Sequence, residues 1–168
     1  MSFLRYGYLI SVFTALRNEL PSEVLDVGFG NGDFLRVCAN AGIRAFGYDI
    51  SGYPLNDERI SVVDWESVMN CRWSVITFFD SLEHIQNLDF VQNLQAEFLV
   101  ISVPWCHWSI DDQEFWRWKH RRPHEHLHHF GADSMNRFME KRGFKRQAWS
   151  NIEDGIRGQL GAMPFRNS

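Results

Sequence analysis

The chain has 168 residues, of which 45% are hydrophobic and 15% aromatic, and its formal net charge is −4 at pH 7. A chain of this length can bury roughly 70% of its unfolded surface, so dominant disorder is excluded and residues 1–168 are expected to form a single domain. The charge is uneven, because residues 1–116 contain 6 Lys and Arg against 16 Asp and Glu, whereas residues 117–168 contain 11 against 5. The basic part also contains five of the seven histidines.

Cysteine usage and hydropathy bear on the compartment. Cys38, Cys71 and Cys106 are odd in number and show no CxxC spacing, so they predict neither a disulfide framework nor a thiolate zinc site. No apolar run approaches the roughly 20 residues of a membrane span. The apolar run Tyr6–Leu16 ends at Arg17 without a small-residue cleavage site, so we interpret it as an amphipathic first helix. We expect a soluble, cytoplasmic protein with no membrane partner.

Short β-type runs then alternate with helical stretches along the chain. The predicted strands are Glu23–Val27, Arg44–Tyr48, Ile60–Val63, Trp73–Phe79, Phe98–Val103 and Phe144–Trp149. The predicted helices between them are Gly32–Ala41, Leu88–Gln95 and Ser134–Arg142, the last capped by Asp133 and ended by Gly143. This alternation predicts a doubly wound α/β sheet of six or seven strands. The tail after Trp149 shows only a weak strand signal around residues 153–157, so the last two strands are expected to be short or irregular.

The first predicted strand leads into three glycines at alternate positions and then into a helix. The residues are Asp26 inside the strand, then Gly28, Phe29, Gly30 and Gly32. A dinucleotide fingerprint needs G-x-G-x-x-G, but here the third glycine comes one place early. The acid that follows it would also repel a pyrophosphate at the helix N-terminus. The pattern D-x-G-x-G-x-G instead suits a cationic or zwitterionic ligand, whose ammonium group Asp26 could receive.

Acids also follow the next two predicted strands. Asp49 ends the second strand 17 positions after Gly32, where an acid accepts hydrogen bonds from both ribose hydroxyls. Asp64 and Trp65 end the third strand, where a carboxylate can accept from an adenine amino group and an aromatic ring can flank the base. Ligands of such sheets bind at the carboxyl ends of the strands. The sequence therefore predicts a nucleoside pocket at this edge.

Together these residues resemble the class I S-adenosylmethionine-dependent methyltransferases. Much of the rest resembles the methyltransferase-domain family that includes ubiquinone-biosynthesis-type O-methyltransferases. The motifs that carry the resemblance are D-x-L-E-H at Asp80–His84, a fifth strand ending at Pro104, P-x-E-H-L at Pro123–Leu127, and the Gly143-Phe144 pair. The resemblance covers roughly Val24 to Trp149. Ser74 stands where relatives usually carry Asp, and the chain is unusually short.

The resemblance implies a Rossmann-like class I methyltransferase sheet, methyltransferase activity and S-adenosylmethionine as the cofactor. It implies that the glycine turn surrounds the methionine part of the cofactor, that Asp49 holds the ribose, and that the segment after the fourth strand forms the wall near the sulfonium. The cofactor-binding residues predicted in this way are Asp26, Gly28, Phe29, Gly30, Gly32, Asp49, Ile50, Asp64, Trp65, Phe79, Asp80 and Leu82.

Methyl transfer from a sulfonium is an in-line displacement at an activated carbon, so positioning can supply much of the catalysis. A base is needed only when the acceptor must lose a proton, and the predicted catalytic candidates are His84 and His126. The histidines of the stretch His120–His129 match no tight ligand template, so no metal is expected.

The segment Pro104–Arg122 mixes tryptophans with basic residues. It could stack on a nucleic acid, cover a planar or anionic small acceptor, or fill the core. The motifs typical of DNA methylation are missing, whereas RNA stays open. We expect methyl transfer to an oxygen or nitrogen of a small or mid-sized acceptor, anionic or proton-losing. The alternatives are an RNA or nucleotide methyltransferase, a non-catalytic S-adenosylmethionine-binding module that needs a partner, and an NAD-dependent oxidoreductase, which the glycine spacing disfavours.

Overall fold

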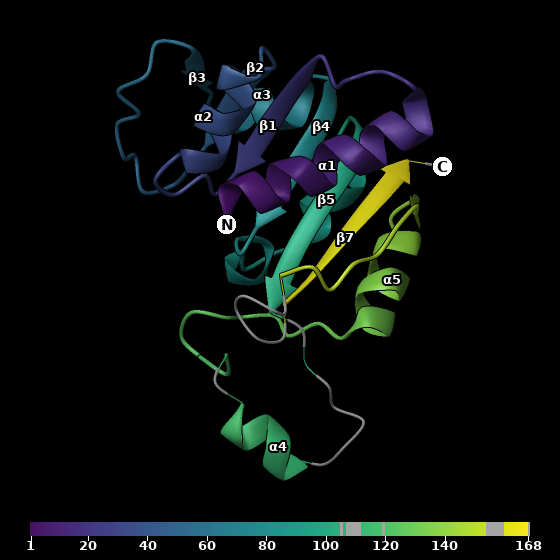
Figure 1. Ribbon diagram of the computed structural model, residues 1–168. Coiled ribbons are helices and arrows are strands. Elements are labelled where there is room, and N and C mark those ends of the chain that lie inside the picture. Colours follow the sequence, from purple (N-terminus) through teal and green to yellow (C-terminus); the bar gives the residue numbers. More distant parts are fainter. Residues whose placement is uncertain (105, 107–111, 119, 154–159, 168) are drawn as a thin grey trace.

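The computed structural model describes residues 1–104, 106, 112–118, 120–153 and 160–167. Within these residues seven strands form one sheet in the order β3-β2-β1-β4-β5-β7-β6. Strands β1 to β5 are parallel, whereas β7 runs antiparallel to both β5 and β6 (Figure 1). Their bounds are β1 Glu23–Val27, β2 Arg44–Tyr48, β3 Ile60–Val62, β4 Trp73–Phe79, β5 Ala96–Pro104, β6 Phe144–Arg146 and β7 Leu160–Asn167.

Helices pack on both faces of this sheet. One face carries α1 (Ser2–Arg17) and α2 (Asp33–Asn40), and the other carries α3 (Trp65–Asn70) and α5 (Ala132–Glu140). Two 3₁₀-helices, η1 (Leu82–His84) and η2 (Asp89–Asn93), follow β4, and the short α4 (Asp112–Arg117) lies apart from the sheet (Figure 1). No helix in the described part of the chain is long and apolar enough to cross a membrane.

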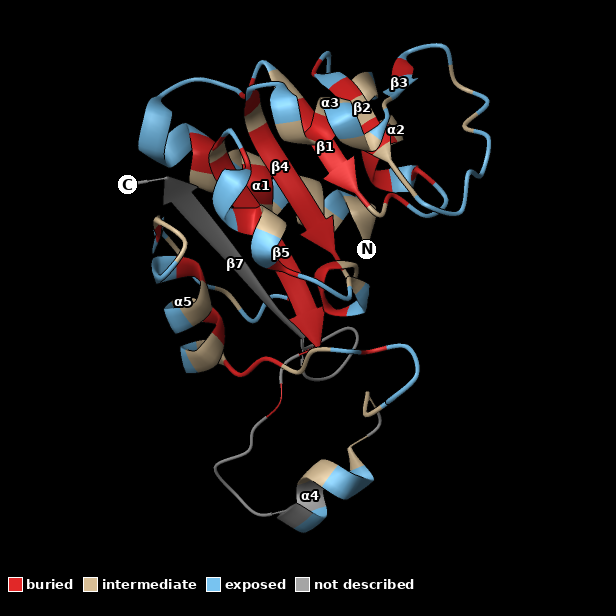
Figure 2. Ribbon diagram, turned by 180° about the vertical axis from the view of Figure 1, so that it is seen from behind, coloured by how far each residue is buried: buried red, intermediate tan, exposed pale blue. Residues whose placement is uncertain are grey.

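The core consists of two hydrophobic layers because successive strand residues face opposite sides of the sheet. Val24, Val75 and Val100 pack in the layer under α1 and α2. Their strand neighbours Leu25, Ile76 and Leu99 pack in the layer under α3 and α5. Figure 2 shows β1, β4 and β5 as almost continuously buried. Burial on both faces explains why these strands read as continuous apolar runs in the sequence.

The predicted bounds of β1, β2 and β4 are confirmed, and the doubly wound α/β fold is confirmed with them. The expectation of short or irregular final strands holds for β6, which has three residues, and is wrong for β7, which has eight. β7 pairs with β5 from Phe98 to Pro104. Its sequence hides this role because it contains Gly161 and Pro164, which ordinarily argue against an interior strand. The weak signal at Asp154–Arg157 lies outside the described residues.

Two helix predictions also need correction. The stretch Leu88–Gln95 contains the 3₁₀-helix η2 rather than an α-helix. The apolar residues that predicted the helix are nevertheless buried, and they are Leu88, Val91 and Leu94. Their spacing of three residues places them on one side of a 3₁₀-helix, which repeats every three residues. α5 is capped at Gly131 rather than at Asp133, because the Gly131 N–H donates to Ser134 Oγ at 2.8 Å.

Candidate cofactor and acceptor site

The strand order reverses between β1 and β4, and a cavity of about 700 Å³ opens at the carboxyl ends of the parallel strands there. This is the position at which doubly wound sheets bind their ligands. The cavity is lined from four strand ends and from one later loop, by Val27, Gly28, Tyr48, Asp49, Ile50, Trp65, Asp80, Ser81, His84, Ile85, Gln86 and Leu127. Six of the predicted site residues are among them, namely Gly28, Asp49, Ile50, Trp65, Asp80 and His84.

The glycine turn forms the floor of this cavity. Gly28 has a φ of 82°, a backbone conformation that residues other than glycine rarely adopt. Its N–H donates to the Tyr48 carbonyl at 2.7 Å. A Cβ at Gly28 would lie 2.5 Å from the Cβ of Ser81. Gly30 also has a positive φ, of 55°, but a Cβ there would meet nothing within 4 Å. Gly28 therefore brings bare main chain to the cavity, whereas Gly30 does not line it and instead directs its N–H to Asp49.

Asp49 is held in place by the same turn. Its Oδ2 accepts from the Gly30 N–H at 2.9 Å, and its Oδ1 accepts from the Ser51 N–H at 2.8 Å and from the Ser51 hydroxyl. Partial burial opposes ionisation, but the hydrogen bonds from Ser51 and Gly30 outweigh it and lower the pKa of Asp49. The side chain is therefore a fixed anion at the end of β2, suited to accept from ligand hydroxyls.

Apolar and aromatic side chains form the wall beside Asp49. The Tyr48 and Trp65 rings lie 5.1 Å apart between centroids, and Trp65 also packs edge-on against Phe90. Ile50 is 93% exposed at the rim of the cavity. An apolar side chain this exposed beside two aromatic rings fits a planar ligand that would cover it.

Asp80, at the end of β4, is held by an ion-paired cluster from both ends of the chain. Arg5 of α1 donates to Asp80 Oδ2 at 2.7 Å and to both carboxylate oxygens of Glu153 at 2.9 Å, and its guanidinium lies over the Phe79 ring. Burial disfavours the charged form of Arg5, but the hydrogen bonds and charges of Glu153 and Asp80 raise its pKa overall. Asp80 itself has a φ of 55°, so the chain is tightly constrained where it enters the cavity.

Asp26 lies one layer below the cavity. Its side chain is buried, and its Oδ1 accepts from the Thr77 hydroxyl at 2.6 Å. Burial raises the pKa of Asp26 to about 7, against the opposing effects of Thr77 and Arg5. Asp26 does not line the cavity, so a direct contact with a ligand ammonium requires that the ligand reach past the floor, or that a water bridge the two.

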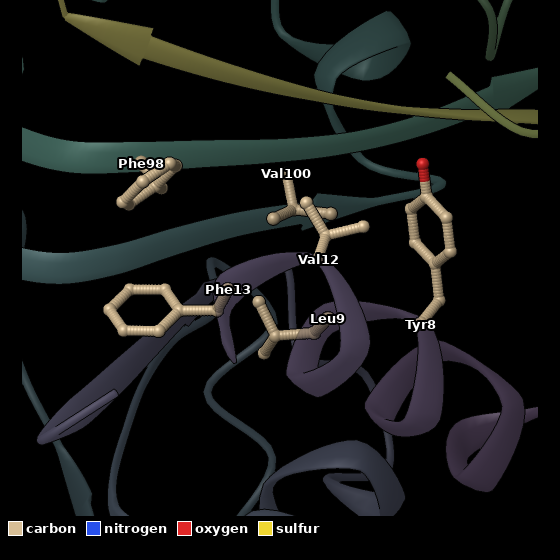
Figure 3. Close-up of a pocket in the computed structure, with 6 residues that line it drawn as sticks. All are labelled: Tyr8, Leu9, Val12, Phe13, Phe98 and Val100. Carbon is tan, nitrogen blue, oxygen red and sulfur yellow. The ribbon is translucent and has the colours of Figure 1, made fainter. Parts of the chain in front are cut away.

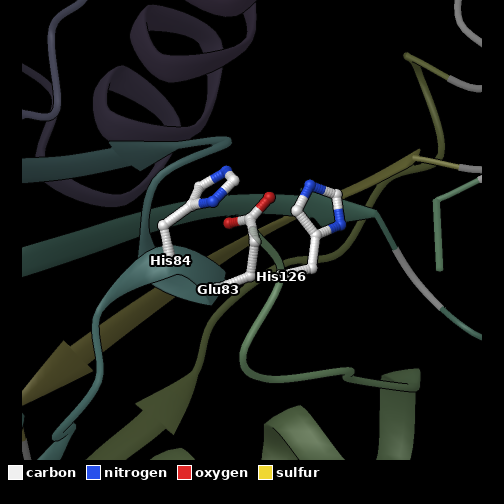
Figure 4. A group of neighbouring side chains, drawn as sticks. All are labelled: Glu83, His84 and His126. Atoms are coloured by element: carbon white, nitrogen blue, oxygen red, sulfur yellow. The ribbon is translucent and has the colours of Figure 1, made fainter. Parts of the chain in front are cut away.

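The predicted catalytic histidines lie together in a cluster with Glu83 (Figure 4), and of these three residues only His84 lines the cavity. The ring centroids of His84 and His126 are 4.7 Å apart, and one ligand atom from each of the three residues lies within 4.8 Å of the others. Burial lowers the pKa of His126, and the neighbouring His84 lowers it further. Burial also raises the pKa of Glu83 to about 8.

Several predicted cofactor residues are not brought to the cavity. Phe29, Phe79 and Leu82 are buried because their apolar side chains pack into the two core layers. Gly32 is the N-cap of α2, where a Cβ would overlap the Leu55 side chain. Asp64 is the N-cap of α3, and its carboxylate accepts from the Ser67 N–H at 2.8 Å.

Other site residues had no signal in the sequence. Arg5 and Glu153 support Asp80 from positions 148 residues apart, and no local pattern connects them. Leu127 belongs to the P-x-E-H-L motif but has no role of its own there, and it lines the cavity because its N–H donates to the Glu83 carbonyl at 2.8 Å. In the segment of tryptophans and basic residues, Trp105, His107, Trp108 and Lys119 lie outside the described residues.

A second hollow, between α1 and β5, is not a ligand site. It measures about 10 Å³ and is lined by Tyr8, Leu9, Val12, Phe13, Phe98 and Val100 (Figure 3). That volume is about one water-sized sphere, and its lining is apolar apart from the Tyr8 hydroxyl. It is a packing gap under the first helix.

Comparison with known proteins identifies the family. The family described as a methyltransferase domain matches residues 4–148, most of the chain. The chain belongs to this family. It is an S-adenosylmethionine-dependent methyltransferase, as the resemblance of its motifs implied. No curated protein sequence matches the chain.

Solved structures of methyltransferases share the fold. Magnesium protoporphyrin IX methyltransferase (ChlM) from Synechocystis PCC 6803, with bound SAH, has a TM-score of 0.68 at 12% identity, over 99% of this chain and 84% of that one. Burkholderia thailandensis 1,6-didemethyltoxoflavin-N1-methyltransferase has a TM-score of 0.69 at 16% identity, over 96% and 77%. The plantazolicin methyltransferase BpumL has a TM-score of 0.70 at 14% identity, over 99% and 84%. At these identities the likeness concerns the fold.

The cavity fits the family's cofactor. A nucleoside with a positively charged amino-acid tail needs an acceptor for its hydroxyls, a wall for its base and a close main-chain approach. Asp49, Trp65 and the bare turn at Gly28 supply these three features side by side.

Proposed function

We propose that this methyltransferase acts on an oxygen or nitrogen of a small or mid-sized acceptor that is anionic or loses a proton. The observation that carries the proposal is a single cavity with two chemically different sides. Asp49 and Trp65 lie on one side, and His84 and Leu127 lie on the other. On the second side, Leu127 comes from the basic, histidine-rich part of the chain, whereas His84 comes from the turn after β4 in the acidic first part.

The cofactor side is proposed to hold the nucleoside. Asp49 keeps its negative charge at neutral pH because its pKa is lowered, and it stands at the strand end where ribose hydroxyls are bound in related sheets. Trp65 and Ile50 are proposed to enclose the base. The Asp80 carboxylate favours a cationic tail, and Asp26, below the floor, would add to this when a nearby cation ionises it. Binding of ribose hydroxyls and of a cationic tail would thereby account for some of the acidic residues in the first part of the chain.

The chemistry places few demands on the acceptor side. S-adenosylmethionine, when bound, supplies a methyl group on a sulfonium sulfur that is a good leaving group. The protein must then hold the acceptor atom in line and keep water out. It must also provide a group that takes up or stabilises the proton or charge of the acceptor. His84 and His126 are proposed for that last role because His84 lines the cavity and the His126 ring packs against it.

The RNA alternative has weaker support in the described residues. The Arg121 guanidinium lies 4.0 Å from the Trp116 ring centroid and also over Phe115. An arginine and two rings that an RNA would need for stacking therefore already pack on one another. We also propose the cytoplasmic location expected from the sequence, in which three cysteines without CxxC spacing predict no disulfide framework.

The test compares ligand binding in matched variants by calorimetry. We expect S-adenosylhomocysteine to bind the unsubstituted protein, NAD not to bind, and Asp49→Ala to weaken S-adenosylhomocysteine about 10- to 100-fold, because charge-assisted hydrogen bonds contribute about 1.5–3 kcal/mol. The control is Asp133→Ala, which removes an exposed carboxylate on α5 and should leave affinity unchanged.

Product formation then identifies the acceptor class. Release of S-adenosylhomocysteine is measured with phenols, carboxylic acids, amines and RNA as acceptors. Turnover with a small acceptor supports the proposal. Turnover with RNA alone, with binding that weakens steeply as salt rises, would replace it by the RNA alternative. Tight cofactor binding with no turnover on any acceptor would favour a module that needs a partner.

A further inference from the structure

We propose that Glu83, His84 and His126 form a binding site for one divalent transition-metal ion at the acceptor side of the cavity. The site itself follows from the geometry of the three side chains. What the ion would do there, which is to hold and polarise an acceptor oxygen, rests on the proposed function. This inference reverses the expectation of no metal, which was based on the spacing of the histidines in the sequence.

The three side chains converge although they come from two distant segments. Figure 4 shows the Glu83 carboxylate beside the imidazole rings of His84 and His126. Their ligand atoms lie within 4.8 Å of one another. An ion bound at about 2.0–2.2 Å from each ligand atom needs separations of about 3–4 Å, so small side-chain rotations complete the site.

Glu83 supplies the reason to expect a cation. Its side chain is 1% exposed, and neither carboxylate oxygen has a hydrogen-bond partner in another residue that the structure describes. A buried carboxylate without partners is strongly unfavourable, and such groups are ordinarily paired or coordinate a metal. The nearest buried guanidinium, Arg5, is already bound to Asp80 and Glu153. A bound cation would supply the missing partner.

Both histidines are oriented in the way that metal ligands require. Nδ1 of His84 lies 2.7 Å from the Glu125 carbonyl oxygen, which can only accept, so Nδ1 carries the proton and Nε2 is free to ligate. The backbone of His120 likewise accepts a hydrogen bond from the His126 imidazole. A backbone carbonyl on the second ring nitrogen is the usual support of a metal-bound histidine.

The backbone around the cluster is also tied down. The Glu83 carbonyl accepts from the N–H groups of Leu127, at 2.8 Å, and of His128, at 3.2 Å. The ring of His128 in turn hydrogen-bonds the Ile85 carbonyl at 2.9 Å. These contacts hold the segment of His126 against the turn that carries Glu83 and His84. The backbone that carries the three side chains is therefore held in place before any ion arrives, which reduces the ordering that binding would require.

The donor set indicates the class of ion. One carboxylate and two imidazoles suit Zn²⁺, Mn²⁺ or Fe²⁺ better than Ca²⁺ or Mg²⁺, which prefer oxygen ligands alone. Three protein ligands leave at least one coordination position open, as in metal sites that act on a substrate. His84 lines the cavity, so the open position can face an acceptor oxygen. The ion would act there as a Lewis acid.

The experiment measures metal binding directly. Chelator-treated full-length protein is titrated with Zn²⁺ and with Mn²⁺ by calorimetry, and metal content is measured after dialysis. We expect about one ion per chain, with affinity at least about tenfold weaker in Glu83→Gln and in His126→Asn, since even outer-shell changes weaken metal sites 10- to 100-fold. The control, His124→Gln, changes an exposed histidine two positions from His126 and should bind as the unsubstituted protein does.

The outcomes separate this inference from the proposed function. S-adenosylhomocysteine binding is measured on the same samples. If it binds but neither ion binds saturably, or if Glu83→Gln and His126→Asn both retain the metal affinity, the metal site is refuted and the methyltransferase proposal stands. If an ion binds but no acceptor is methylated, the proposed function fails and the site survives. Should the variants not fold, ring ¹⁵N shifts of His84 and His126 on Zn²⁺ addition decide, and unchanged shifts refute the site.

Discussion

Alanine substitutions at three glycines test the turn after β1. The three glycines share a positive φ but differ in what surrounds them. Gly28, Gly30 and Gly42 have φ values of 82°, 55° and 80°. Alanine in this conformation costs about 1–2 kcal/mol at any of them. A Cβ at Gly28 would also lie 2.5 Å from the Cβ of Ser81, whereas at Gly30 and Gly42 it would meet nothing within 4 Å. Gly42 precedes β2, at the opposite edge of the sheet from the cavity.

The expected losses of stability follow from this difference. Gly42→Ala should lower the free energy of unfolding by about 1–2 kcal/mol, and Gly30→Ala by about the same amount. The loss of stability in Gly28→Ala should be larger than these by about 1–3 kcal/mol, because its methyl group overlaps Ser81 and overpacking is destabilising. Urea unfolding of the four proteins measures these values. Replacing Ser81 by Gly in the Gly28→Ala background should recover part of the loss.

Ligand binding distinguishes the two substitutions that lack a clash. Gly30 lies two positions after Gly28, which lines the cavity, and its N–H donates to Asp49, so a methyl group there would disturb both the turn and the carboxylate that a ligand is expected to meet. We expect Gly30→Ala to weaken S-adenosylhomocysteine at least about tenfold, which corresponds to about 1.4 kcal/mol. Gly42→Ala should leave the affinity unchanged.

Two results would refute this reasoning. If Gly28→Ala is no less stable than Gly42→Ala, the close approach of the turn to Ser81 is not a real constraint. If Gly30→Ala binds S-adenosylhomocysteine as Gly42→Ala does, the turn does not receive the cofactor. In the second case the proposed nucleoside side of the cavity would have to be abandoned.

Further predictions concern the charged groups around the cavity. The pKa of Asp26 is raised to about 7, so folding favours its neutral form and the stability of the protein should fall as pH rises from about 4 to about 7. Asp26→Asn should reduce that fall in unfolding measured across this range, and an unchanged pH dependence would contradict the assigned burial. Asp64→Ala should cost about 1 kcal/mol through loss of the α3 cap while Asp64→Asn should not, and cofactor affinity should change in neither. A loss of affinity in both would restore the adenine contact predicted from the sequence. Arg5→Met should cost about 3–5 kcal/mol because it leaves the Glu153 carboxylate buried and unpaired, and adding Glu153→Leu should recover much of the thermal stability. Equal stability of the single and double variants would argue against the buried ion pair.

Much of the fold could be predicted because its signals are local. The runs that form β1 and β4 are buried on both faces, so their apolar character is continuous and their bounds are readable from the sequence. The glycine turn and the acid at Asp49 follow two of these strands directly. Since parallel strands present their carboxyl ends at one edge, placing the residues along the chain also placed them in space.

Predictions failed where a partner distant in the sequence decides the structure. β7 contains a glycine and a proline, and it is a strand because β5 and β6 pair with it on either side. That pairing cannot be derived from residue type and spacing, because it depends on which distant strands lie on either side of residues 160–167.

The sequence by itself determined the doubly wound sheet, the methyltransferase family and the cofactor edge, because hydrophobic periodicity and residues at strand ends are properties of adjacent positions. Only the tertiary structure decided how the charged groups are used. It pairs Arg5 of the first helix with both Asp80 and Glu153, which lies near the other end of the chain. It also brings Glu83 and His84 against His126. Folding therefore brings charged and titratable groups from both parts of the chain together around one cavity. Each of these groups would be unfavourable if it were buried alone.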